Sequence, residues 1–128
     1  MGTDIHGVVE KKVRLDGVDK WVAVNILRYD DKATDRNYER FAKLAGVRGE
    51  GPAPKGLPVD ISESTRVIYD EECGHSASWL PLEDAVKIFN DTERRADEDT
   101  GKSFTAYDYF GLWSYEGKLY RLVFWFDS

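Results

Sequence analysis

One run of apolar residues near the end of the chain constrains the fold more than any other feature. Residues 121–127 have the sequence Arg-Leu-Val-Phe-Trp-Phe-Asp. In an extended strand, successive side chains leave opposite faces. The two faces of this strand would carry Leu122, Phe124 and Phe126 on one side and Arg121, Val123 and Trp125 on the other. A strand that is apolar on both faces must be covered on both sides, so this strand is predicted to lie in the middle of a sheet.

Two further strands are predicted at the start of the chain. Residues 4–13 would place Ile5, Gly7 and Val9 on one face and Asp4, His6, Val8 and Glu10 on the other. Residues 21–27 also alternate, and Asp16-Gly17 between the two segments predicts the tight turn of a hairpin. A second hairpin is expected near the C-terminal end, where residues 107–115 and 118–126 flank Glu116-Gly117.

Helices are predicted between the two hairpins. The first begins after an Asp35 cap and ends at Gly46. The second is capped by Asp60 or Ser62, and the third begins at Pro81.

This order of elements predicts one α+β domain over residues 1–128. Its sheet would be antiparallel or mixed, built from the N- and C-terminal hairpins and packed by about three helices. The length of 128 residues is typical of one domain. Residues 48–58 are rich in proline and glycine, so they are predicted to form an ordered surface loop.

Charge and cysteine content restrict the partners. The chain has 18 Lys and Arg against 24 Asp and Glu, a formal net charge of −6. Because cationic side chains supply most of the affinity for phosphates and anionic lipids, neither duplex nucleic acid nor a membrane is an expected partner. The single cysteine, Cys73, allows no internal disulfide and fits a reducing cytoplasm. The first residues lack the pattern of a signal peptide.

Five ordered motifs resemble a family of small uncharacterised bacteriophage and prophage proteins. The motifs are Met-Gly-x-Asp-Ile-His-x-x-x-Glu at residues 1–10, Arg-Asn-Tyr-x-x-Phe-Ala-x-Leu-Ala-Gly-Val-Arg at 36–48, Lys-Gly-Leu-Pro-x-Asp at 55–60, His-Ser-x-Ser-Trp-Leu at 75–80, and residues 121–127. The resemblance implies a viral origin and a place in the cytoplasm of a bacterial host, and it implies no reaction. The chain departs from its relatives at Pro81, where they carry Thr, and at Ser128, where they carry Asn.

Asp4 and His6 occupy positions i and i+2 of the first expected strand, so their side chains share one face. Such a pair can bind a divalent metal, or the carboxylate can orient the imidazole for acid–base chemistry. The alternative is structural, with His6 bonded to a neighbouring loop and Asp4 capping a turn. A metal site usually needs three or four ligands and only two are adjacent, so no metal ligands are assigned.

His75, Ser76 and Ser78 precede the third expected helix. Serine hydroxyls and free backbone N–H groups at a helix start can hold a phosphate or carboxylate. The alternative is that Ser78 simply caps the helix while Trp79 and Leu80 enter the core.

Arg36, Asn37 and Arg48 flank the first expected helix. An arginine fork recognises phosphates and carboxylates through two parallel hydrogen bonds. The alternative for Arg48 is a structural role, tying the proline- and glycine-rich loop to a carboxylate such as Asp127 or Glu10.

Asp127 ends the last strand, and it would approach Asp4 and His6 if the first and last strands pair. A cluster that also includes Glu10 and His75 would then be possible. Aromatic side chains of the C-terminal part could stack a base, but on strands they more often belong to the core. These aromatic residues are Tyr107, Tyr109, Trp113, Tyr115, Tyr120 and Trp125.

We therefore expect a non-enzymatic protein that binds a small anionic, nucleotide-like ligand or a host protein, with counter-defence as a role that the phage resemblance implies. The candidate ligand-binding residues are Asp4, His6, Arg36, Asn37, Arg48, His75, Ser76, Ser78 and Asp127. One alternative is a metal-dependent hydrolase or phosphoesterase that uses Asp4, His6, His75 and Asp127. Another is a protein-interaction module. The sequence identifies no cofactor and leaves open whether the protein is a homo-oligomer.

Overall fold

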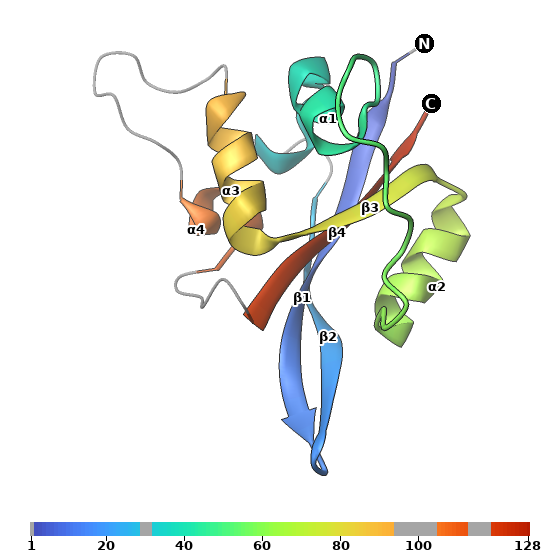
Figure 1. The fold of residues 1–128 in the computed structure, drawn as a ribbon, viewed down its shortest axis with the longest axis vertical. Helices are drawn as coiled ribbons and strands as arrows, with labels where there is room; N and C mark the ends of the chain where they lie inside the picture. The colour runs from blue at the N-terminus through green and yellow to red at the C-terminus, as the bar shows by residue number, and fades with distance from the viewer. Residues whose placement is uncertain (1, 29–31, 94–104, 113–118) are drawn as a thin grey trace.

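The computed structural model describes residues 2–28, 32–93, 105–112 and 119–128. Four strands form one antiparallel sheet in the order β2-β1-β4-β3. The strands are β1 (Asp4–Leu15), β2 (Val18–Ile26), β3 (His75–Pro81) and β4 (Tyr120–Asp127). The helices are α1 (Tyr38–Ala45), α2 (Glu63–Glu72), α3 (Leu82–Asp91) and α4 (Ala106–Phe110), with a short 3-10 turn at Lys32–Thr34. Figure 1 shows the chain termini side by side at one end of the sheet. The α+β class is thereby confirmed.

The central position of β4 is also confirmed. It pairs with β1 on one side and with β3 on the other. Leu122, Phe124 and Phe126 pack with α1, α3 and α4 in the larger hydrophobic cluster. Val123 and Trp125 belong to a smaller cluster on the opposite face, where Ile68 and Tyr69 of α2 pack against them. The two-sided apolar pattern of this strand therefore reflects two separate helical layers.

The β1–β2 hairpin forms as predicted. Asp16 and Gly17 both have positive φ, 51° and 78°, as a type I′ turn requires. The register shifts between Val9 and Glu10, so that β2 carries an extra residue there. The tip of this hairpin extends beyond the helices (Figure 1).

Helix boundaries follow local capping chemistry. The predicted Ser62 cap is confirmed, since its side chain accepts a hydrogen bond from the Thr65 N–H. The Asp35 cap is wrong, because Asn37 caps α1 through the Arg40 N–H. Asparagine and aspartate are about equally preferred at the N-cap of a helix, so residue type did not distinguish Asn37 from Asp35.

Two expectations for the C-terminal half are wrong. Residues 75–81, where no strand was predicted, form β3, so Ser78 lies inside a strand and does not cap a helix. The predicted third helix exists as α3 and begins at Leu82, one residue after Pro81. Residues 106–110 form α4, so the strand predicted over residues 107–115 does not form at residues 107–110. Thr105 and Asp108 form a reciprocal capping box that favours a helix over the strand tendency of the aromatic residues. The predicted turn at 116–117 lies outside the described residues, as do Trp113 and Tyr115.

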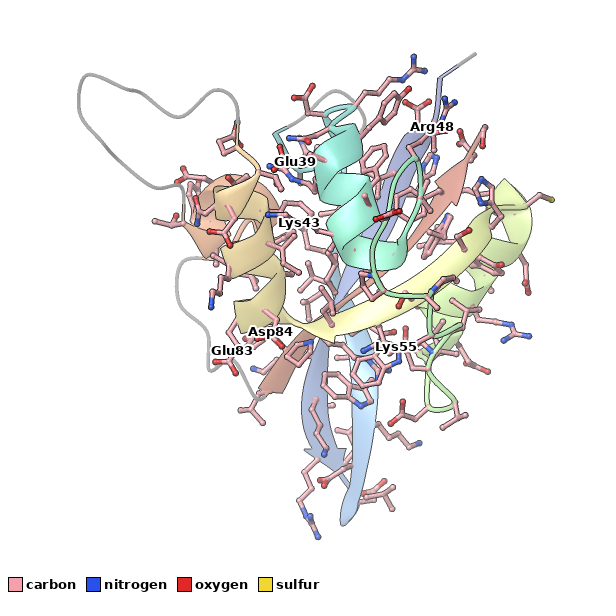
Figure 2. The ribbon with its side chains drawn as sticks, turned by 45° about the horizontal axis from the view of Figure 1, so that its top comes forward. Glu39, Lys43, Arg48, Lys55, Glu83 and Asp84 are labelled. Atoms are coloured by element: carbon pink, nitrogen blue, oxygen red, sulfur yellow. The ribbon has the colours of Figure 1, made fainter. Side chains whose placement is uncertain are left out.

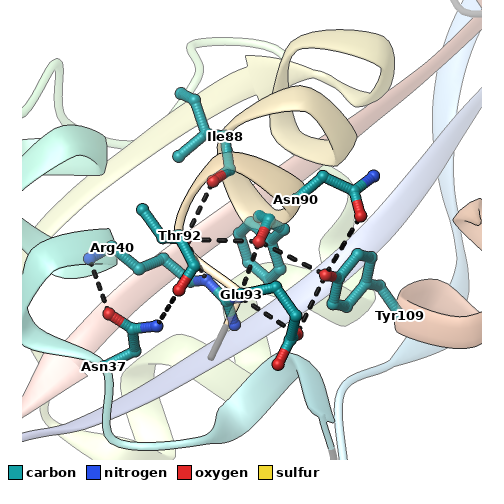
Figure 3. Close-up of polar contacts among 8 residues, drawn as sticks. Asn37, Arg40, Ile88, Asn90, Thr92, Glu93 and Tyr109 are labelled. Atoms are coloured by element: carbon teal, nitrogen blue, oxygen red, sulfur yellow. Dashed lines mark hydrogen bonds and ion pairs between the residues drawn. The ribbon is translucent and has the colours of Figure 1, made fainter. Parts of the chain in front are cut away.

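A buried polar network joins α1, α3 and α4 on the larger cluster's side (Figure 3). Arg40 donates to the Thr92 hydroxyl at 2.9 Å and to the Phe89 carbonyl at 2.8 Å. Tyr109 donates its phenol to Glu93 at 2.9 Å. Burial lowers the pKa of the Arg40 guanidinium and raises the pKa of the Tyr109 phenol. These polar groups therefore hold the three helices together and are too deeply buried to contact a ligand.

The two edges of the sheet differ. The outer edge of β3 is covered by the 48–58 loop, where the Gly56 N–H donates to the Ala77 carbonyl at 2.8 Å and the Lys55 N–H to the Ser78 hydroxyl at 3.1 Å. At the other edge, no strand in the described part of the chain pairs with the outer side of β2. Among the residues that the structure describes, the sheet therefore has one covered edge and one open edge.

Candidate functional site

Pairing of β1 with β4 brings three of the predicted site residues together. Asp4 lies directly opposite Asp127, and His6 lies opposite Trp125. The His6 Nε2 atom is bonded to the Asp127 carboxylate. Its Nδ1 atom lies 3.3 Å from Glu72 at the end of α2. The predicted partnership of His6 with Asp4 is thus replaced by contacts with two other carboxylates.

Glu72 also accepts a hydrogen bond of 2.6 Å from the Trp125 indole. A single carboxylate therefore ties the last turn of α2 to both β1 and β4. Helix α2 covers the smaller cluster. The contact of His6 with Glu72 therefore has a structural role, because it holds the end of this helix against the sheet. Sequence reasoning missed Glu72, and no local pattern around it points to the strands.

Asp4 forms an ion pair with Arg36, with Nε to Oδ1 at 2.7 Å. The hydrogen-bonded Arg36 guanidinium holds the pKa of the Asp4 carboxyl below its usual range, against an opposing effect of burial. Two of the candidate ligand-binding residues therefore bind each other.

His75 lies on the other side of the sheet from His6. It pairs with Phe126, which belongs to the larger cluster, whereas His6 pairs with Trp125 of the smaller one. Residues directly opposite in a ladder share a face. His75 instead contacts the hydroxyls of Ser76 and Ser128, each at 2.9 Å. The predicted five-residue cluster is therefore wrong, because the two histidines cannot serve one site.

Glu10 is buried at a distance from the chain ends and forms an ion pair with Arg121. The Arg121 Nη2 atom lies 2.6 Å from the Glu10 carboxylate. Glu10 also accepts hydrogen bonds from the Ser62 N–H at 3.0 Å and the Thr65 hydroxyl at 2.7 Å. These three residues make four contacts with the carboxylate, two of them from Arg121, and leave it no capacity for a ligand. Glu10 was one of the carboxylates suggested as a partner of Arg48, but its arginine partner is Arg121.

The remaining candidates also have internal contacts. Arg48 donates to the Thr3 hydroxyl at 2.9 Å and lies 5.0 Å from the centre of the Tyr38 ring. Asn37 is buried, and its side chain donates to the Thr92 carbonyl. Figure 2 shows Arg48 near the start of the loop that crosses in front of the sheet and Lys55 farther along it. The residues predicted to bind an anion are therefore spread over separate structural contacts.

Across the described residues, no group of three His, Cys, Asp or Glu is arranged to hold a metal ion. Within the same residues, no helix combines the length and the apolar character needed to cross a membrane.

Hollows in the surface lie instead along β2. One of about 470 Å³ lies between the middle of β2 and the start of α2, and is lined by Trp21, Ala23 and Ser64 among others. A second, of about 700 Å³, follows residues 23–28 and also touches Ser64. A third, of about 440 Å³, separates the end of β2 from α4. None of the candidate ligand-binding residues lines any of these three hollows.

Apolar side chains are exposed next to these hollows. Val24 and Ile26 of β2 are 43% and 51% exposed. Val67 of α2 is 55% exposed and lines a further hollow that shares Ser64 with the first two. We call Val24, Ile26, Val67 and the open outer side of β2 the β2 edge. The sequence shows the alternating apolar residues of β2 but gives no sign that they face solvent.

Comparisons of the chain with protein-family models, with curated proteins and with solved structures find no match.

Proposed function

We propose that this protein acts by binding a partner protein, and that the partner docks on the β2 edge. The observation that carries the proposal is a strand of nine residues, Val18–Ile26, whose outer backbone groups have no strand partner among the described residues. Open edge strands bind extended polypeptide segments through main-chain hydrogen bonds, and side-chain pockets beside them add specificity.

Two properties of the rest of the molecule support a protein partner over a small anion. The residues predicted to bind an anion already bind other parts of the chain, and a ligand on the Nε–Nη2 side of Arg36 would have to displace Asp4. The opposite edge is covered by the chain's own loop, whereas the β2 edge exposes valine and isoleucine. An exposed apolar strip beside an open strand is typical of an interaction surface.

The phage resemblance suggests where the partner is found. Under this proposal it is a protein of the bacterial host, and interference with host defence is one role that such binding would serve. Neither an enzymatic reaction nor a metal enters the proposal.

Site-specific photo-crosslinking in bacterial cells tests the proposal. A photoreactive amino acid at position 24 should give an adduct of one discrete mass, because Val24 lies in the proposed contact. The matched control is position 59, because Val59 is another exposed valine, on the loop before α2. The adduct is identified by mass spectrometry of the purified protein. Identical adducts at both positions, or none at position 24, would refute the proposal.

A further inference from the structure

We infer that the segment that docks on the β2 edge is an extended strand with acidic residues at both ends and uncharged, apolar residues between them. This inference rests on the proposed function and adds the chemistry of the partner.

The charges at the ends of β2 carry the first part of the inference. Lys20 lies near the start of β2 and Arg28 lies two residues past its end, and both are exposed. Neither forms an ion pair with a carboxylate among the described residues. An extended chain rises about 3.3 Å per residue, so a strand lying along β2 can reach both cations. Carboxylates at the two ends of the docked strand would then pair with Lys20 and Arg28.

The tip of the β1–β2 hairpin differs in charge from the rest of the molecule. Residues 11–20 contain four Lys and Arg but two Asp, while the whole chain has a formal net charge of −6. One of those two carboxylates, Asp19, is already paired with Arg14 at 3.2 Å. A local excess of cations on an acidic protein attracts an acidic segment to this part of the surface and repels a basic one.

The middle of the β2 edge favours apolar rather than acidic residues in the docked segment. Val24, Ile26 and Val67 expose apolar surface there, which an apolar partner side chain would bury. Glu63 and Asp60 line the hollow between β2 and α2 together with Lys20, so an acidic side chain facing α2 would be repelled except next to Lys20. The acidic residues therefore belong at the ends of the docked segment.

A second copy of this chain fits the same edge poorly. The one carboxylate in β2 is Asp19, which is engaged by Arg14, so a second β2 brings no free acid to Lys20. Two molecules of the same negative net charge also repel each other.

Two synthetic peptides test the inference on the full chain. Both alternate threonine and valine over the length of β2, and they end in glutamate or in lysine. Amide hydrogen exchange of residues 18–26 reports docking, since a paired edge slows exchange of the outward amides. We expect the glutamate-ended peptide to protect these amides and to bind up to about tenfold more tightly, with the difference shrinking at high salt.

A charge-reversed variant provides the decisive control. Lys20→Glu combined with Arg28→Glu should reverse the preference between the two peptides, whereas Lys43→Glu on α1 should leave it unchanged. Equal binding of both peptides to the wild-type protein would overturn the acidic preference and leave docking at β2 intact. Protection that rises with protein concentration and needs no peptide would make a second copy the occupant and overturn the inference. Protection of β2 under none of these conditions would overturn the proposed function as well.

Discussion

The Glu10–Arg121 pair shows how one buried charge can organise a face of the sheet. Glu10 is fully buried and accepts hydrogen bonds from Arg121 and from the first turn of α2. Arg121 in turn reaches the Asp60 carboxylate at 2.8 Å and lies 4.0 Å from the centre of the Trp21 ring. A buried ion pair adds little net stability compared with an apolar pair of similar size. Removing one partner, however, leaves the other charge buried without a counterion, which is strongly destabilising. We therefore assign the pair to the positioning of α2 against the sheet.

Glu10→Ala should lower the free energy of unfolding by about 3–5 kcal/mol, because it leaves the Arg121 guanidinium and the Ser62 N–H without their buried acceptor. Urea denaturation measures the change. Glu50→Ala, at an exposed position of the 48–58 loop, should stay within about 0.5 kcal/mol of the wild type. Combining Glu10→Met with Arg121→Met should recover part of the loss. A single Glu10→Ala variant as stable as the control would show that the charge is not buried as described.

Helix α2 is held on the sheet at both ends by polar contacts. Its first turn binds Glu10, and Glu72 in its last turn binds His6 and Trp125. The helix buries few residues of its own, since Thr65 is the one fully buried side chain that it carries. These contacts, more than helix propensity, therefore keep α2 beside β2, where Val67 forms part of the β2 edge.

Glu72→Ala should loosen the end of α2. The Trp125 indole would lose its acceptor, which costs about 1–2 kcal/mol. Amide exchange at residues 69–73 should then speed up more than exchange in α3. The matched control is Glu71→Ala, the neighbouring exposed glutamate on the same helix. Equal exchange in the two variants would contradict the role given to Glu72.

The whole molecule depends on the buried network that joins three helices over one face of the sheet. Arg40 is 1% exposed and contacts α3 directly, and Tyr109 brings α4 to the same point through Glu93. The Arg40 guanidinium also lies 4.3 Å from the centre of the Phe89 ring. Since α1, α3 and α4 share these groups and the larger cluster, we expect them to unfold together with the sheet.

Arg40→Ala should destabilise the fold by about 3 kcal/mol or more, because it leaves Glu93, the Thr92 hydroxyl and the Phe89 carbonyl without their shared donor. Unfolding followed by far-ultraviolet circular dichroism and by tryptophan fluorescence should still give coincident curves. Lys43→Ala, one turn along on the exposed side of α1, serves as the control. Separate transitions would mean that the helices do not form one unit with the sheet.

Local patterns were sufficient for several parts of the fold. The two-sided apolar run of β4, the alternation of β1 and the Asp16-Gly17 turn all follow from backbone geometry over a few residues. The same reasoning failed at residues 106–110, where aromatic residues favoured a strand. Thr105 and Asp108 satisfy the backbone N–H groups of the first helical turn, and that capping signal outweighed propensity.

Local sequence patterns do not determine the order of the strands in the sheet. The pairing of β1 with β4 places His6 next to Asp127, and the packing of α2 brings Glu72 to the same imidazole. His75 lies on the opposite face of the sheet. The position of β2 at the outside likewise leaves Val24 and Ile26 exposed, although their alternation resembles that of a covered strand. Each strand's own residues therefore specify its conformation and its two faces, because those depend on neighbours along the chain. Which polar groups meet, and which edge stays open, depends on contacts between segments that are far apart in sequence.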